Sequence, residues 1–284
     1  NVGIGVIALD ANTTGSDNIG IGRSALGANT TASNNTAVGG LALTANTTGT
    51  ENVALGNNAL DSNTTANNNT AVGMAALQAN TTGANNVGLG SGALYNNTTA
   101  SNNTGVGFNS LVSNTTGADN VAIGKDSLDS NTTGAGNVGI GSDALQGNVS
   151  GSSNVAVGND ALKSNTVSGQ IGIGNQSLEA NTSGTENTAV GFQTLMTQSS
   201  NGYMNTAVGY QAGRLNTSGQ SLTAIGFKAL EANTTGDGNT AVGQQALVVN
   251  TTGANNVGVG QSALLANTTG TSNTAVGYQA LDAN

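Results

Sequence analysis

The chain has 284 residues, of which 44 are glycine and 7% are charged, and it contains no Pro, Cys, His or Trp. Its net charge of −9 argues against binding to nucleic acid, which needs a basic stripe, and no apolar run approaches the roughly 18 residues of a membrane-spanning helix. Because His and Cys are missing, the commonest nucleophile–base pairs and transition-metal sites are missing too, so we expect no enzyme, no metal and no cofactor.

The predicted elements belong to one repeat, which begins at the first residue. The glycine that ends segments such as VGIG recurs with a period of 17, at Gly5, Gly22, Gly39 and onward. We number the positions of one unit 1 to 17 from Asn1, and the consensus is N-[VT]-[GA]-[VI]-G-x-x-[AS]-L-x-x-N-T-T-[GA]-x-x. The repeat predicts a single array over residues 1–284, with irregular coils around 148–226 that include one period of 16 and one of 18.

Each unit begins with a predicted strand. At positions 2 to 5, aliphatic residues alternate with small ones, which indicates a short strand. The A-L-x-x-N segment at positions 8 to 12 fits either a second short strand or one helical turn, and we favour β-structure throughout. Charged residues occur only at positions 6, 7, 10, 16 and 17, so we expect these to face water and positions 2, 4 and 9 to face the core. The small residues at positions 3 and 8 allow close approach of either the opposite wall or another chain.

Stacking of such units predicts the fold class. One unit cannot bury its aliphatic residues alone, whereas stacked units form a continuous core. We therefore expect an all-β protein, a parallel β-solenoid (β-roll or β-helix) of about 17 coils with a 17-residue repeat. The aromatic residues fall at turn positions, which indicates a thin core of aliphatic layers.

The Asn at position 12 recurs in an Asn-Thr-Thr triplet, which has two interpretations. Because like residues stack in a solenoid, these side chains are expected to form a structural amide ladder at a corner of the coils, with a second column at position 1. The ladder comprises Asn12, Asn29, Asn46, Asn63, Asn80, Asn97, Asn114 and Asn131. The triplet is also an N-glycosylation sequon, but sugars on every coil would lie about 4.8 Å apart, and an Asn held in a ladder could not carry one.

Two further groups of residues are candidates for binding. A row of threonines that could bind ice consists of Thr13, Thr30, Thr47, Thr64, Thr81 and Thr98, although neighbouring threonines on a strand point to opposite faces. Exposed rings that could stack on sugars lie near the irregular coils, at Phe192, Tyr203, Tyr210 and Phe227. We interpret the divergent segment 196–204 as a bulge tolerated on the surface.

Segments such as NTAVGYQA at 205–212 and NTAVGYQAL at 273–281 are similar to known repeats. They resemble the repeats of phage and bacterial tail-fibre-like proteins, and the NVAIG-type segments resemble the head repeats of trimeric autotransporter adhesins. The resemblance is periodic and covers the whole chain, although the adhesin head unit is shorter than the 17 residues seen in this sequence. It implies a left-handed parallel β-roll, often trimeric, in a surface fibre that adheres or acts as a spacer.

These observations favour a structural function. We expect a segment of a longer fibrous protein outside the cell, as a surface fibre or a virion appendage, that projects other parts or adheres. We expect self-association as a homotrimer or an end-to-end filament, contact with a host surface or glycan, and neither nucleic-acid binding nor membrane insertion. The alternative is a binding module that uses a repeated Thr/Asn face to bind ice or glycan.

Overall fold

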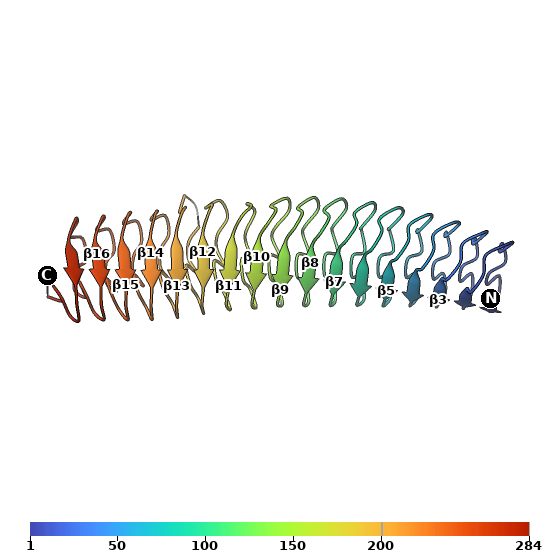
Figure 1. Cartoon of the computed structure of the whole chain (residues 1–284), viewed down its shortest axis with the longest axis horizontal. Helices are drawn as coiled ribbons and strands as arrows, with labels where there is room; N and C mark the ends of the chain where they lie inside the picture. Colours follow the sequence, from blue (N-terminus) through green and yellow to red (C-terminus); the bar gives the residue numbers. More distant parts are fainter. Residues whose placement is uncertain (200, 284) are drawn as a thin grey trace. The chain divides into compact units, whose positions relative to one another are not determined.

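The computed structural model describes residues 1–199 and 201–283, and their regular secondary structure consists of short parallel strands. The chain divides into two compact units, Asn1–Ser142 and Asp143–Asn284. Each coil contributes one three-residue strand, and within each unit the strands lie side by side and point the same way (Figure 1). The prediction of an all-β, parallel β-solenoid with a 17-residue repeat is confirmed.

The strands keep one register along each unit. Those of the first unit are β1 (Val2–Ile4), β2 (Ile19–Ile21), β3 (Thr36–Val38), β4 (Val53–Leu55), β5 (Thr70–Val72), β6 (Val87–Leu89), β7 (Thr104–Val106), β8 (Val121–Ile123) and β9 (Val138–Ile140). Those of the second unit are β10 (Val155–Val157), β11 (Ile171–Ile173), β12 (Thr188–Val190), β13 (Thr206–Val208), β14 (Thr223–Ile225), β15 (Thr240–Val242), β16 (Val257–Val259) and β17 (Thr274–Val276). Both period changes leave the strand pairing intact, since Val155 pairs with Ile171 and Thr188 with Thr206.

Each strand points its small central residue into the coil. At position 3, Ala37 is fully buried, and a Cβ added to Gly20 would lie 3.1 Å from the carbonyl oxygen of Ala25 and 3.2 Å from Cγ of Leu9. The interior beside the strand therefore has room for little more than a methyl group. The prediction that positions 2 and 4 face the core is wrong for this reason: these larger side chains point outward, and Ile123 at position 4 is 39% exposed.

The A-L-x-x-N segment forms neither a strand nor a helix but a run of stacked turns, and it is the wall that the small strand residues face. Its leucines at position 9 are in the core as predicted, and Leu26 and Leu43 are completely buried. All of these leucines have a left-handed backbone, with φ between 49° and 54°, which a bulky side chain seldom adopts. The turns still bond one coil to the next, since the N–H of Leu77 donates to the carbonyl oxygen of Ala93 at 2.9 Å.

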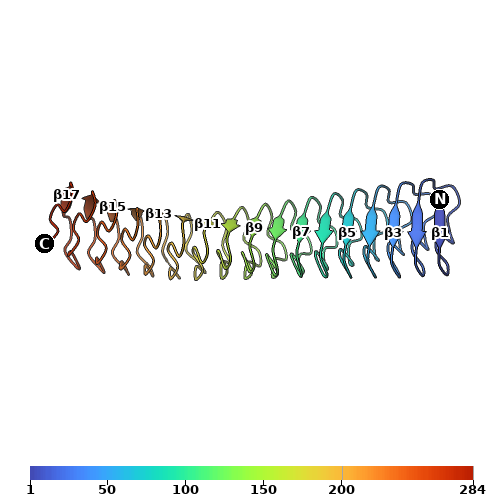
Figure 2. The ribbon, with the colours of Figure 1, turned by 90° about the horizontal axis from the view of Figure 1, so that it is seen from below.

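A glycine ends each strand because no other residue fits at position 5. The glycines there have φ between 127° and 144°, a region that is open essentially to glycine alone. A Cβ on Gly124 would lie 2.6 Å from the carbonyl carbon of Gly141 in the next coil, far inside van der Waals contact. This glycine lets the coils of each unit follow one another as similar, closely spaced loops (Figure 2).

Candidate functional site

The asparagines at position 12 lie in a column at one corner of the coils. Nδ2 of Asn80 donates to Oδ1 of Asn63 at 3.1 Å and to the backbone oxygen of Gly83 at 2.9 Å, and Nδ2 of Asn97 donates to Oδ1 of Asn80 at 2.9 Å. The same side-chain bonds connect the column from one coil to the next through Asn12, Asn29, Asn46, Asn63, Asn80, Asn97, Asn114 and Asn131. All but Asn12 are fully buried, so the column is part of the core.

A second buried column, at position 1, meets the first at the same corner. The backbone N–H of Asn86 donates to Oδ1 of Asn69 in the preceding coil at 2.9 Å, and Nδ2 of Asn69 donates to the oxygen of Gly83 at 2.9 Å. The oxygen of Gly83 therefore accepts from Asn69 and from Asn80. Because buried polar groups need partners, the shared backbone oxygens at this corner serve both columns and fix the path of the chain between them.

The threonines after each column asparagine have different environments. Thr81, at position 13, is half-buried, and its hydroxyl donates to the backbone oxygen of Thr98 at 3.0 Å. The row of Thr13, Thr30, Thr47, Thr64, Thr81 and Thr98 is tied to the backbone by the same bond in each coil. Position 14, as at Thr82, is exposed, so it is this second threonine that presents a hydroxyl to solvent.

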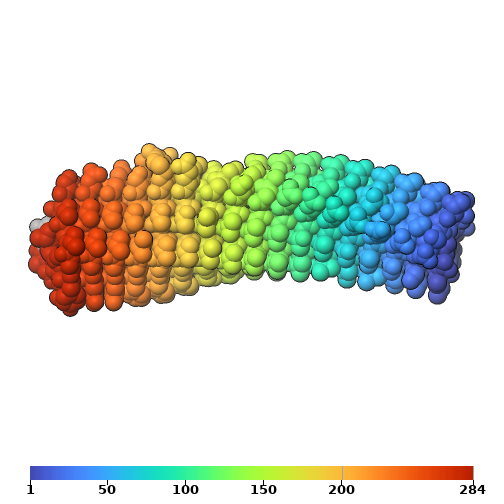
Figure 3. Space-filling model, viewed as in Figure 1, coloured from blue at the N-terminus to red at the C-terminus, as the bar shows by residue number. Residues whose placement is uncertain are grey.

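The outward residues at positions 2 and 4 form an apolar surface across the strands, which we call the strand face. In the first unit it comprises positions 2 and 4 of β1 to β9, and in the second unit those of β10 to β17; every residue is Val, Ile, Leu or Thr. Leu89 and Ile123 at position 4 are 36% and 39% exposed. Within each unit the surface side chains of successive coils line up in rows (Figure 3). No charged residue interrupts the strand face.

Three of the four candidate rings form a stack at position 6. The ring centroids of Phe192 and Tyr210 are 5.3 Å apart, and those of Tyr210 and Phe227 are also 5.3 Å apart, with nearly parallel planes. Tyr210 therefore has both faces covered and offers only its edge to a ligand. Tyr203 takes no part in these two ring contacts and lies half-buried before β13.

The charged side chains lie on turns. Lys125 and Asp126 form an ion pair at 2.5 Å. A hydrogen bond to Asp160, assisted by nearby carboxylates, raises the pKa of Lys163, while burial raises the pKa of the Asp61 carboxyl. Among residues 1–199 and 201–283, no three His, Cys, Asp or Glu side chains gather where they could hold a metal, and no helix is long and apolar enough to span a membrane.

Sequence reasoning missed the strand face because it assigned the larger aliphatic residues to the core. The signal that could have found it is the composition of position 3, which is Gly or Ala in every coil. Positions 2 and 4 vary among Val, Ile, Leu and Thr. Position 3 accepts only the two smallest residues, so space is most limited there. In a thin coil, space is limited on the inside, so position 3 should face inward.

The fold and its buried amide columns define the chain as a parallel β-solenoid with one strand in each coil. No protein-family model matches the chain, and no curated protein compared with it matches either. What the chain does must therefore follow from its repeated interior and from its surfaces.

Proposed function

We propose that the chain is a structural segment of an extracellular fibre, a repetitive spacer for surface projection or adhesion that performs no catalysis. The observation that carries the proposal is the uniformity of the coils, which bury the same Leu and Asn and end each strand at the same Gly. A solenoid in which each coil contacts only its neighbours is extended simply by adding coils, which suits projection. The resemblance to tail-fibre and adhesin head repeats supports a location on a cell surface or a virion.

The strand face supports lateral association with further copies of the chain. In the first unit, nine strands spaced about 4.8 Å apart and three residues of about 3.3 Å each give a face of roughly 400 Å², as large as the largest apolar patches of many monomers. The eight strands of the second unit give a similar face, so each face by itself supplies about half of the roughly 800 Å² that a partner contributes to a stable interface. A second copy is the natural occupant, because its face has the same spacing and is equally free of charge.

Light scattering at several concentrations tests this association. We expect a homotrimer, with a mass three times the 27.4 kDa of the chain. Replacing Leu89 and Ile123 with lysine places charges in the middle of the strand face and should shift the mass to that of the monomer, because unpaired charges are costly to bury. Thr116→Lys is the matched control, since this residue is exposed at position 14 and away from the face.

The wild-type chain and both variants must give the same far-UV circular dichroism, so that a change in mass is not a loss of fold. A wild-type monomer at every concentration would overturn lateral association. Masses that grow without limit and persist in the double lysine variant would favour end-to-end stacking instead.

Ice or glycan binding through the repeated Thr/Asn face is a second candidate function. It is supported by the exposed threonine column at position 14, which runs through the first unit from Thr14 to Thr133. Ice-growth inhibition by the wild-type chain, and its loss on replacing Thr82 and Thr99 with lysine, is the expected result. Absence of inhibition at high protein concentration would remove ice from the candidates, and a glycan array would test the other ligand class.

A further inference from the structure

The Asn-x-Ser/Thr sequons of this chain fall into groups that the fold treats differently. Those at position 12 have their amide in the buried column, where Nδ2 of Asn29 donates to Oδ1 of Asn12 at 2.9 Å and to the backbone oxygen of Ala32 at 3.1 Å. A sugar on that nitrogen would remove one of the two bonds and would need space that a fully buried side chain lacks. The corner sequons from Asn29 onward are therefore incompatible with modification of the folded chain.

Three sequons begin instead at position 17, on an exposed turn of the first unit. They start at Asn34, Asn68 and Asn102, and all three side chains are exposed. Their backbones are left-handed, with φ of 60° or 63°, which asparagine tolerates better than most residues. The backbone N–H of Asn34 donates to the carbonyl oxygen of Ser16 at 3.0 Å, and that of Asn68 donates to the carbonyl oxygen of Thr50 at 3.2 Å. A sugar on the side-chain amide leaves these bonds between coils intact.

The hydroxyl residue of each of these sequons is also accessible. It lies at position 2, as the first residue of β3, β5 and β7, and these residues are Thr36, Thr70 and Thr104. Each is only half-buried and lies on the outward side of its strand. A transferase that recognises the sequon needs both the amide and this hydroxyl. At Asn102 the exposed amide donates one N–H to Oδ1 of Asp119 at 3.0 Å, and its second N–H is the one that a sugar would replace.

Two sequons outside these groups have a hydroxyl that is already hydrogen-bonded. Asn96 is exposed, but the hydroxyl of Thr98 is engaged, since it donates to the backbone oxygen of Thr115 at 3.1 Å. Asn175 is followed by Ser177, which is fully buried and donates its hydroxyl to the backbone oxygen of Ala189 in the next coil at 3.2 Å. Exposure of the asparagine alone therefore does not separate the sites; what sets these two sequons apart is a hydroxyl that is already bonded to a backbone oxygen.

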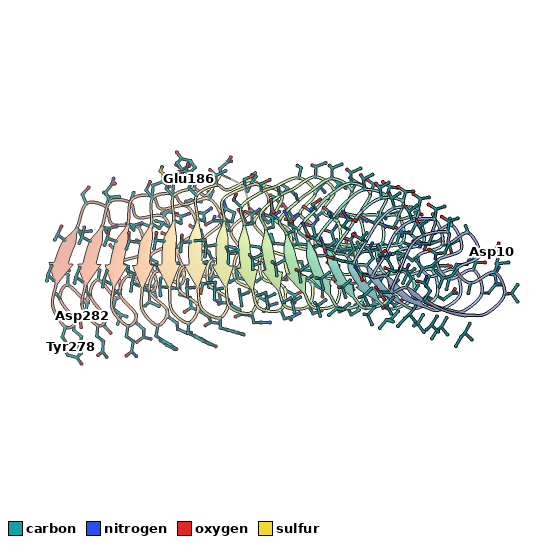
Figure 4. The ribbon with its side chains drawn as sticks, turned by 45° about the vertical axis from the view of Figure 1, so that its right-hand side comes forward. Asp10, Glu186, Tyr278 and Asp282 are labelled. Atoms are coloured by element: carbon teal, nitrogen blue, oxygen red, sulfur yellow. The ribbon has the colours of Figure 1, made fainter. Side chains whose placement is uncertain are left out.

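The spacing of the three sites leaves room for sugars. They fall on every second coil, about 9.6 Å apart, because the coils between them have valine at position 2, as at Val53 and Val87. In the second unit, Glu186 occupies the same position 17 and lies at the edge of its coil opposite to Tyr278 and Asp282 (Figure 4). The row thus follows an edge of the coils at which the strands begin.

We infer that Asn34, Asn68 and Asn102 are acceptor sites for N-linked sugar on the folded single chain, before its strand face, which includes Thr36, Thr70 and Thr104, associates with another copy. The co-reactant is a sugar activated as a glycosyl diphosphate, brought by a transferase that acts on finished proteins. The bond from the sugar anomeric carbon to Nδ2 forms as the bond from that carbon to the diphosphate oxygen breaks. The diphosphate leaves with the electron pair, and one amide proton passes to a base of the transferase.

Glycosylation in vitro tests the inference. The purified folded chain is incubated with UDP-glucose and a soluble N-glycosyltransferase of relaxed Asn-x-Ser/Thr specificity. Intact-mass spectrometry then counts the added hexoses, and peptide mass spectrometry locates them. We expect up to three added hexoses, confined to Asn34, Asn68 and Asn102. A synthetic peptide of residues 27–38 contains both Asn29 and Asn34 and should be modified at both, which would attribute the selection to the fold. No hexose on the folded chain while the peptide is modified, or equal occupancy of Asn29 or Asn96 in the folded chain, would overturn the inference.

Substitutions at position 2 supply matched variants that keep the fold. Replacing Thr36, Thr70 and Thr104 with valine should abolish all three additions, and valine already stands at this position in the neighbouring coils. Val87→Thr creates a sequon at Asn85, which is exposed at position 17, and should add a fourth acceptor. Because Asn85 lies one coil from Asn68 and Asn102, sugars there should lower each other's occupancy. If Val87→Thr adds no acceptor, the edge geometry is not what makes these sites reactive, and the inference fails.

Discussion

The buried asparagine column should dominate the local stability of the coils, and Asn80 is a suitable place to measure it. Its amide donates to Oδ1 of Asn63 and to the oxygen of Gly83, and its own Oδ1 accepts from Asn97. Leucine has a similar volume, so Asn80→Leu tests the hydrogen bonds with little change in packing. In this variant the oxygen of Gly83 still accepts from Nδ2 of Asn69. Oδ1 of Asn63 loses the donor Nδ2 of Asn80. Nδ2 of Asn97 keeps only its bond to the backbone oxygen of Ala100.

Oδ1 of Asn63 and one N–H of Asn97 thus lose their partners in the core, and each loss costs about 1–3 kcal/mol. We expect Asn80→Leu to lower the free energy of unfolding by about 2–6 kcal/mol, measured by urea denaturation. Hydrogen exchange should show the loss of protection concentrated in the adjoining coils, because repeats of this kind contact only their neighbours. Thr82→Ala, in the exposed position of the same coil, is the control and should change stability by no more than about 0.5 kcal/mol. If the two variants were equally stable, the column would not hold the corner.

Asn80→Asp adds a dependence on pH to the same experiment. The new carboxylate would face two acceptors, Oδ1 of Asn63 and the oxygen of Gly83, so its pKa in the folded chain should rise above the ordinary value. An acid whose pKa is raised by folding contributes stability at pH values below its unfolded pKa, and this contribution is lost as the pH rises through its folded pKa. The variant should therefore be closer to wild type at about pH 3 than at pH 7, and the opposite trend would contradict the hydrogen-bond assignment.

Three further substitutions test other parts of the coil. Gly124→Ala forces a Cβ against the carbonyl of Gly141 in a backbone region reserved for glycine, so thermal unfolding should show a loss of about 3 kcal/mol or more. Asp61→Asn should raise the melting temperature at pH 7 and leave it unchanged at about pH 3, because burial raises the pKa of this carboxyl and the destabilising charge forms only above its ordinary pKa. Gln198→Asn should lower the melting temperature, because the shorter amide cannot reach the oxygen of Gly202, to which Gln198 donates at 2.9 Å; an unchanged melting temperature would show that this bond contributes nothing.

The period and the residues that maintain it could be predicted from the sequence, because a solenoid places like on like and a glycine or leucine needed once is needed in every coil. Which strand side chains face the core could not be predicted, since alternation over three residues fits either orientation. The orientation is decided by the thin interior, which has room only for the small residue. The run of turns was also beyond prediction. Leucine disfavours a left-handed backbone by about 1–2 kcal/mol, and only the complete burial of residues such as Leu26 offsets that cost. For the candidate rings, a shared repeat position is what brings Phe192, Tyr210 and Phe227 together, and Tyr203 does not share it.

The two irregular coils show what the fold preserves when its period changes. In a regular coil the corner asparagine donates to the oxygen three residues later, as Asn63 does. In the 16-residue coil, Asn165 donates to Val167, two residues later, at 2.7 Å, whereas in the 18-residue coil Gln198 reaches Gly202, four residues later. The extra methylene of glutamine spans the inserted residue, so the corner bond survives, and the strands on either side stay in register. Coil length is therefore free to vary wherever a side chain of matching reach closes the corner, while the strand, its small inward residue and its terminal glycine are not.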